Sequence, residues 1–286
     1  MGLNAVICGS GFIGAIHANA YKNVKGVELK GIFDINDSKS EEFSKKYKIK
    51  QYKEYSDVLN DDNIDLIDIC VPTFKHREYV EKALNACKNV LCEKPLALNL
   101  EDAEHIINIS EKSNTKFMIG HTHRFYKENV IVQEAATSNK LGKILSCSAY
   151  RLGVRPDWSE NSWIIDGSKS GGAATDFILH DIDLCNWIGG KPEVVMAQGL
   201  RSSNGAWDYM GISIGYDSGI FIEKEKALFP DWEKRDPFEI EIEYFIDCIL
   251  NQKSIEIVQP IDAFRALQVS LAAKESAQKM KPIRIK

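Results

Sequence analysis

The chain has 286 residues, of which 44% are hydrophobic and 27% charged, and its formal net charge is -5 at pH 7. This length fits one large or two ordinary domains with buried cores, and the interspersed charges exclude a basic surface for nucleic acid or an anionic membrane. No apolar run approaches the ~18 residues that span a bilayer, and the N-terminus lacks a signal-peptide pattern, so we expect a cytoplasmic protein. Seven scattered cysteines without a C-x-x-C pair predict reduced thiols rather than disulfides or a zinc site.

Residues 1–121 alternate short β-rich runs with amphipathic helical stretches. We expect helices at 12–23, 38–47, 76–87 and 101–113, and strands at 3–8, 28–33, 65–71, 89–92 and 116–119. Apolar strands separated by segments of helical length form right-handed β-α-β crossovers, with helices on both faces of a parallel sheet. The first domain is therefore predicted to be a doubly wound (Rossmann) α/β domain.

The pattern changes at about residue 120 and predicts a second domain over 122–286. A helix at 124–138 and a strand near 143–152 lead to a loop with Pro156, Trp158 and Trp163. Further helices are expected at 173–188, 238–250 and 261–279. Strands at 194–200, 207–216 and 219–223 have no helices between them, so they should pair as an antiparallel meander. This is the pattern of an α+β domain built on a mainly antiparallel open sheet.

A glycine motif, G-x-G-x-x-G, follows the first expected strand and opens the first helix. Its residues are Gly9, Ser10, Gly11, Phe12, Ile13 and Gly14. The first glycine permits a tight turn, the second lets the backbone approach a pyrophosphate, and the third allows close packing of the helix on the strand. The helix N-terminus offers free N–H groups to the phosphates. In this context the motif predicts a dinucleotide site.

The second strand ends at Asp34, which lies 20 residues after Gly14. A carboxylate at this place accepts hydrogen bonds from the adenosine ribose and repels a 2′-phosphate, so it favours NAD over NADP. Lys39 is close enough in sequence to leave NADP open.

Lys94 stands in Glu93-Lys94-Pro95, directly after an apolar strand. A side chain at the carboxyl end of a parallel strand lies at the crevice where open α/β sheets bind ligands. Pro95 restricts Lys94 to extended backbone. A solvated surface charge is the alternative interpretation of a single lysine at a strand end.

The segment 171–183 reads G-G-x-x-x-D-x-x-x-H-x-x-D. In a helix, Asp176, His180 and Asp183 lie on one face because they are spaced i, i+4 and i+7. We interpret them as an acid–base group aimed at a substrate. An exposed polar face and a metal site are the alternatives, although the sequence shows no convincing further ligand.

Taken together, these motifs resemble the glucose–fructose oxidoreductase/inositol dehydrogenase (Gfo/Idh/MocA) family over most of the chain. The resemblance rests on the glycine fingerprint, Pro72-Thr73 with His76, Glu93-Lys94-Pro95, and the 171–183 segment. That last segment, together with Arg124, is more similar to the inositol- and sugar-dehydrogenase branch. The resemblance implies a catalytic pair, Lys94 and His180, oriented by Asp176. It also implies a substrate side at Asp183 and Arg124, and cofactor contacts from Pro72, Thr73, His76 and Glu93.

The resemblance further implies a homo-oligomer, either a dimer or a tetramer, assembled through the open sheet of the second domain. The run from 219 to 236 is shorter than in relatives, which puts edge strands of this sheet in doubt. We expect an NAD-dependent oxidoreductase that moves a hydride to or from a sugar or cyclic polyol, with no metal. The alternative is a redox sensor that binds NAD(P) without turning it over.

Overall fold

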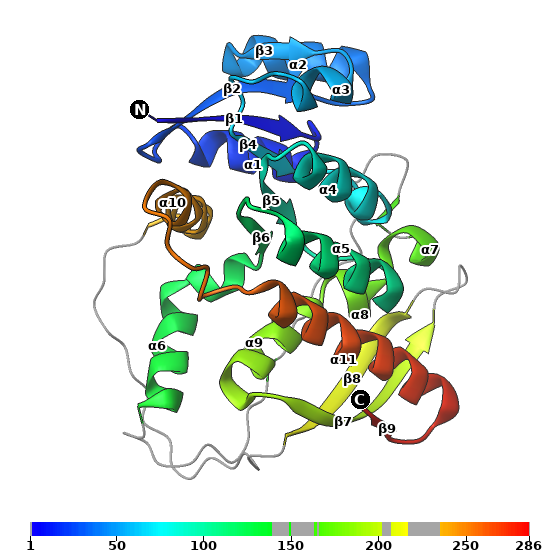
Figure 1. The fold of residues 1–286 in the computed structure, drawn as a ribbon. Coiled ribbons are helices and arrows are strands. Elements are labelled where there is room, and N and C mark those ends of the chain that lie inside the picture. Colours follow the sequence, from blue (N-terminus) through cyan, green and yellow to red (C-terminus); the bar gives the residue numbers. More distant parts are fainter. Residues whose placement is uncertain are drawn as a thin grey trace.

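The computed structural model describes residues 2–138, 149, 163–164, 166–201, 207–216 and 235–285. Its first part contains a six-stranded sheet in the order β3-β2-β1-β4-β5-β6, and every neighbouring pair is parallel (Figure 1). The strands are β1 Leu3–Cys8, β2 Val27–Phe33, β3 Lys50–Tyr52, β4 Leu66–Ile69, β5 Asn89–Glu93 and β6 Phe117–Gly120. The doubly wound sheet is confirmed. All five expected strands form, with ends that differ by no more than a few residues, and β3 is an additional strand that was not expected.

Helices follow the strands as the β-α-β pattern requires. They are α1 Phe12–Ala20, α2 Asp37–Tyr47, α3 Tyr55–Leu59, α4 His76–Asn85 and α5 Leu100–Lys112, with a short 3-10 helix η1 at Thr73–Lys75. Asn36 and Asn99 cap α2 and α5 because their side-chain oxygens accept from the amides of Lys39 and Asp102. Helices α4 and α5 lie on one side of the sheet and α1 on the other (Figure 1). The strand order reverses between β1 and β4, where open α/β sheets bind ligands at their carboxyl ends.

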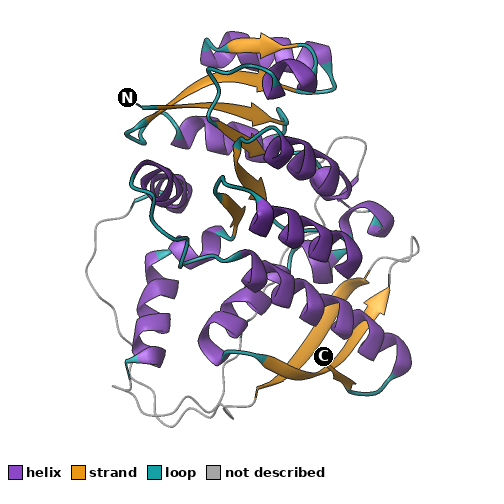
Figure 2. Cartoon of the chain, in the orientation of Figure 1, coloured by secondary structure: helices purple, strands orange, loops and turns teal. Residues whose placement is uncertain are grey.

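The second part is built from helices and a small antiparallel sheet (Figure 2). Its strands β7 Pro192–Arg201, β8 Trp207–Tyr216 and β9 Ile283–Arg284 are ordered β8-β7-β9. Its helical segments are η2 Thr122–Phe125, α6 Lys127–Thr137, α7 Gly167–Ser170, α8 Ala173–Asp176, α9 Leu179–Gly189, α10 Pro237–Leu250 and α11 Pro260–Lys279. The antiparallel pairing of the two strands predicted at 194–200 and 207–216 is confirmed. The strands expected at 143–152 and 219–223, and the loop with Pro156 and Trp158, lie outside the described residues.

The prediction of one helix over 173–188 is wrong. The structure has two helices, α8 and α9, with a turn at residues 177–178. The carbonyl oxygen of Asp176 accepts from Lys94 Nζ at 2.8 Å. In an uninterrupted helix that carbonyl would accept from the amide of residue 180. The ammonium group of Lys94, which follows β5, therefore occupies the carbonyl oxygen at the point where the helix is interrupted.

The last two helices pack on both parts of the chain. Ile242, Phe245 and Ile246 of α10 belong to the same buried cluster as the parallel sheet, and α10 lies beside α1. Farther along the chain, α11 packs on the antiparallel sheet, where its Val269 joins a second cluster with Val195. These helices thus fix the second part against the first, and the carboxyl edge of the parallel sheet lies near their junction.

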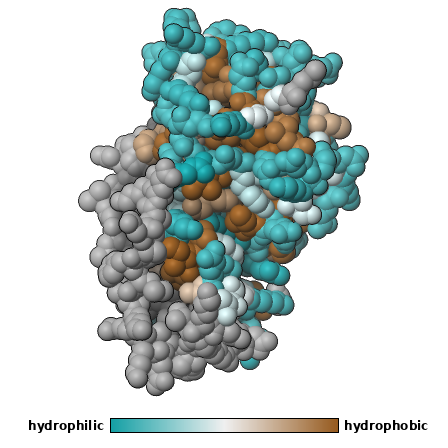
Figure 3. Space-filling view, turned by 90° about the vertical axis from the view of Figure 1, so that its left-hand side faces the viewer, coloured by the Kyte–Doolittle hydropathy of each residue, from teal (hydrophilic) through white to brown (hydrophobic). Residues whose placement is uncertain are grey.

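In the space-filling view the outer end of the first part is mostly hydrophilic (Figure 3). Hydrophobic atoms gather toward the middle of the same face. None of the helices in the described ranges combines the length and the apolar character that crossing a membrane requires.

Candidate active site

The glycine loop has the geometry of a dinucleotide cradle. Gly9 has φ +109°, and a Cβ there would lie 2.5 Å from the carbonyl oxygen of Cys70. A Cβ on Gly14 would lie 2.0 Å from the carbonyl oxygen of Gly9. Gly11, by contrast, faces open space, since a Cβ there would meet nothing within 4 Å. Gly11 is the N-cap residue of α1, whose first turn carries no acidic residue and whose start has no side-chain cap. The open face at a helix N-terminus fits a pyrophosphate.

This contrast predicts opposite results for two glycine substitutions. Gly14→Ala should destabilise the fold because its methyl group collides with backbone, whereas Gly11→Ala should leave the melting temperature nearly unchanged. Gly11→Ala should instead weaken NAD binding by about tenfold or more, because its methyl group fills the space where the pyrophosphate approaches. Thermal unfolding and NAD titration check the two results. Unchanged NAD affinity in Gly11→Ala would remove the loop from the proposed cofactor site.

Asp34 at the end of β2 is tied to the glycine loop. One carboxylate oxygen, Oδ2, accepts from both the amide and the hydroxyl of Ser10, each at 2.7 Å. The other, Oδ1, accepts from the amide of Asn36 at 2.8 Å. An ionised carboxylate has about four lone-pair sites, so acceptor capacity remains for ribose hydroxyls. The two predicted cofactor elements are therefore adjacent in the structure.

The loop after β4 is braced against the segment that carries Lys94. His76 is 1% exposed, and its ring nitrogens lie 2.7 Å from the Pro95 carbonyl oxygen and 3.0 Å from that of Val71. Burial lowers the pKa of His76, and in the neutral ring a single nitrogen donates, so only one of these two hydrogen bonds forms at a time. Thr73 is also buried, at 3% exposure. These contacts give His76 a bracing role between two loops, and its predicted contact with the cofactor stays a prediction.

Lys94 lies directly after β5 and meets Asp176 across 82 positions of sequence. Its Nζ donates to the carbonyl oxygen of Asp176 at 2.8 Å and to Oδ1 at 3.2 Å. Both side chains are largely buried, with 14% of Lys94 and 9% of Asp176 exposed. The Lys94–Pro95 peptide is cis. The structure thus brings together two of the three predicted catalytic residues, although through a pairing that the helical spacing did not predict.

His180 lies in the first turn of α9, just beyond Asp176. Its ring stacks on that of His123, with centroids 4.2 Å apart and planes inclined by 16°. His123 belongs to η2, the short helix that follows β6. The orientation of His180 by Asp176, inferred from a continuous helix, stays a prediction.

Arg124 and Asp183 form a buried bidentate ion pair. The Nε and Nη2 atoms of Arg124 lie 2.8 and 2.7 Å from the two oxygens of Asp183. Arg124 Nη1 also donates to the carbonyl oxygen of Ile257 at 2.7 Å and to Asp262 at 3.0 Å. Arg124 is 3% exposed and Asp183 1%. The pair therefore links η2 to α9, and the contact with Asp262 links η2 to α11. The predicted contact of Arg124 and Asp183 with substrate stays a prediction.

The metal alternative for the 171–183 segment gains no support, because Asp176 and Asp183 pair with two different cations. Among the described residues, one group has donor atoms within 4.8 Å of one another: His17, Asp68 and Cys70. Both ring nitrogens of His17 already face carboxylates, so coordination would displace a hydrogen bond. We assign no metal to this group.

Four further ionisable residues, which no sequence motif indicated, are buried near Glu93 and Lys94: His17, Asp68, His121 and Glu241. The sequence does give one indication of this cluster, because Asp68 is a charged residue inside the apolar run of β4, where it is fully buried. A buried ionised carboxylate needs a partner, and this requirement points to His17.

Comparison with known proteins identifies the family. Residues 3–121 match the family model described as "Oxidoreductase family, NAD-binding Rossmann fold", and residues 130–225 match the model of the GFO/IDH/MocA C-terminal domain. Glucose-6-phosphate 3-dehydrogenase of Bacillus subtilis is 33% identical over 181 residues, which are 62% of this chain and 51% of the relative. Myo-inositol 2-dehydrogenase of Thermotoga maritima is 31% identical over 198 residues, which are 68% of this chain and 57% of the relative.

A solved structure extends the similarity of fold to nearly the whole chain. Scyllo-inositol dehydrogenase from Lactobacillus casei, solved with bound NAD(H) and scyllo-inositol, matches with a TM-score of 0.77 at 21% identity. The match covers 99% of each chain. The sequence matches to the two curated dehydrogenases, in contrast, span only a little over half of those proteins' lengths. With both family models matched in order, the chain belongs to the Gfo/Idh/MocA oxidoreductase family.

Proposed function

We propose that the protein is an NAD-dependent oxidoreductase that transfers a hydride between the nicotinamide and a hydroxyl-bearing carbon of a sugar or cyclic polyol. The observation that carries this proposal is the placement of Lys94, a largely buried cation held by Asp176 at the carboxyl edge of the sheet. A pure NAD sensor has no need of such a cation in its crevice. The dehydrogenase relatives support the substrate class.

The glycine loop and Asp34 would hold the dinucleotide. The open face at Gly11 receives the pyrophosphate, and Asp34 has acceptor capacity for the ribose. The negative charge of Asp34 opposes a 2′-phosphate, which supports NAD over NADP. When bound, the nicotinamide supplies the acceptor or donor of the hydride.

Residues of the chain then accept the hydroxyl proton and stabilise the negative charge that develops on the oxygen. During oxidation, an imidazole nitrogen of His180 takes the hydroxyl proton, because histidine has an ordinary pKa of about 6.5 and exchanges protons near neutral pH. Lys94 Nζ faces the oxygen on which negative charge develops and stabilises it in a site with little water. Asp176 holds the ammonium in place through the two contacts at 2.8 and 3.2 Å.

The test is a turnover screen that offers NAD and NADP in turn with a panel of inositols, aldoses and aldonic acids. We expect NADH to accumulate with at least one polyol or sugar, and faster than NADPH. Turnover with NADP alone would overturn the cofactor assignment. NAD binding without turnover across the panel would favour the sensor, and a chelator that abolished activity would favour a metal enzyme.

The proposal includes assembly into a homo-oligomer through the antiparallel sheet. Val195 and Ala197 of β7 are buried on the face toward α11, so Leu200 belongs to the opposite face. Leu200 pairs in register with Tyr209 of β8, and these two residues are 69% and 60% exposed. Exposed apolar pairs of this kind support a protein interface. Sedimentation of the full chain checks this, and a monomer at all concentrations would contradict it.

A further inference from the structure

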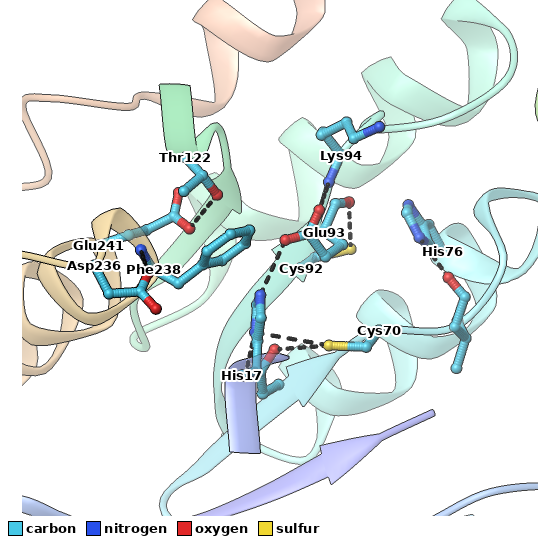
Figure 4. Close-up of polar contacts among 12 residues, drawn as sticks. His17, Cys70, His76, Cys92, Glu93, Lys94, Thr122, Asp236, Phe238 and Glu241 are labelled. Atoms are coloured by element: carbon cyan, nitrogen blue, oxygen red, sulfur yellow. Dashed lines mark hydrogen bonds and ion pairs between the residues drawn. The ribbon is translucent and has the colours of Figure 1, made fainter. Parts of the chain in front are cut away.

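A group of ionisable side chains is buried beneath Lys94, where α1 meets β4 and β5 (Figure 4). His17 of α1 is fully buried, with Nδ1 2.8 Å from Asp68 Oδ2 and Nε2 3.1 Å from Glu93 Oε1. Ionised carboxylate oxygens only accept hydrogen bonds, so both ring nitrogens must donate. The geometry therefore points to an imidazolium bridging two carboxylates.

The groups around His17 agree with this charge state. Burial lowers the pKa of His17, but Asp68 and the other facing groups raise it, and the pKa lies well above its ordinary value. Cys70 Sγ lies 3.7 Å from His17 Nδ1 and donates to Asp68. The Phe238 ring of α10 packs against the imidazole, and Tyr21 lies near Asp68.

Glu241 of α10 is fully buried. Its burial and the charge of Glu93 raise its pKa well above the ordinary value.

Glu93 links this cation to Lys94. Its Oε1 faces His17, and its second oxygen, Oε2, accepts from the backbone amide of Lys94 at 3.1 Å. Opposite Glu93 in β6 stands Gly120, where a Cβ would lie only 2.8 Å from Oε1. The carboxylate is thus fixed on both sides, and it fixes the backbone from which Lys94 extends toward Asp176.

We propose that His17 is a positioning residue for Lys94. It holds the Glu93 carboxylate, which in turn holds the amide of Lys94 and so aims Nζ at the reacting oxygen. The inference rests on the proposed function, in which Lys94 Nζ takes part in the chemistry. Since His17 belongs to the helix that begins at the glycine loop, the same bridge fixes the lysine relative to the cofactor cradle.

Stability alone does not explain this cluster. Burying an ion pair costs desolvation, and well-packed apolar side chains in its place are often neutral or stabilising. The cluster stands where the cofactor helix meets the segment that carries the lysine. In active sites, side chains must be held within about 0.5 Å, which requires supporting residues with fixed hydrogen bonds.

The test compares His17→Gln with the double variant His17→Gln/Asp68→Asn. The single variant leaves two carboxylates without their cation and risks misfolding, whereas the double variant also removes one negative charge. Backbone amide exchange is followed by NMR. We expect exchange at Lys94 to rise about tenfold or more, with the β5 amides of Leu91 and Cys92 unchanged, because only the strand-end hydrogen bond is lost. Unchanged exchange at Lys94 in a folded variant overturns the proposal. His105→Gln, on the outer helix α5 beside Glu81, is the control and should behave as wild type.

Kinetics and the state of the ring give separate readouts. In both variants kcat should fall about tenfold or more while KM for NAD and substrate stays within about twofold, since positioning acts on the chemical step. Nitrogen NMR at about pH 8, where an ordinary histidine is neutral, should show both ring nitrogens of His17 protonated. A neutral His17 ring, or wild-type kcat in both variants, overturns the inference while the proposed function stands. If the wild-type protein turns over no sugar or polyol, the proposed function fails, and amide exchange at Lys94 still decides whether His17 holds it.

Discussion

Replacing Lys94 with alanine is expected to lower kcat by about 10²–10³-fold, the loss that follows removal of one donor aimed at developing negative charge. The substitution removes the ammonium held by Asp176 at 2.8 and 3.2 Å but leaves the glycine loop and Asp34 untouched. NAD affinity should therefore change little. Turnover measured as NADH formation, together with NAD titration of the same variant, separates chemistry from binding.

His180→Ala provides the second half of this prediction. Loss of a general acid–base group typically costs about 10²–10⁴-fold, so the expected fall in kcat is at least as large as for Lys94→Ala. Lys82→Ala is the matched control, because this lysine forms an exposed pair with Glu78 on the outer helix α4. Turnover that survives either substitution at the site would exclude that residue from the catalytic pair.

The parallel sheet could be predicted because buried parallel strands are continuous apolar runs. β4 and β5 illustrate this, because they are almost wholly buried and their short, mostly apolar sequences are recognisable as strands. β3, with the sequence Lys50-Gln51-Tyr52, could not be found in the same way. It is a three-residue edge strand, and its first residue is exposed. β9, which has two residues, gives no periodic signal either.

The candidate site could be predicted only where its residues are close in sequence. The glycine loop and Lys94 follow strands directly, so local pattern places them at the carboxyl edge. At the break between Asp176 and His180, the carbonyl oxygen of Asp176 accepts from an ammonium group 82 positions away, and helical periodicity carries no information about such a distant contact. The bridge from His17 to Glu93 spans 76 positions and likewise exists only in the folded sheet.

Removing one partner of the buried pair Arg124–Asp183 should destabilise the protein strongly. Asp183→Ala leaves a guanidinium that is 3% exposed without its bidentate partner, so we expect the free energy of unfolding to fall by about 3–5 kcal/mol. Urea unfolding measures this loss. Asp247→Ala is the control, since it breaks an exposed pair with Lys253 and should cost far less. An equal loss in the two variants would contradict the assignment of a buried, desolvated pair.

A double replacement separates this structural role from the predicted contact with substrate. Arg124→Met/Asp183→Leu removes both charges and fills a similar volume, so it should recover most of the stability that Asp183→Ala loses. If the pair only holds η2 against α9, the double variant should also keep turnover. If the pair serves the substrate side as the family resemblance implies, the stable double variant should lose affinity for the sugar or polyol. Its NAD affinity should be kept, because the glycine loop and Asp34 follow β1 and β2, whereas Arg124 follows β6 at the far edge of the sheet. A rise in KM for substrate at constant stability would therefore assign Arg124 and Asp183 to the pocket, and an unchanged KM would assign them to the fold alone.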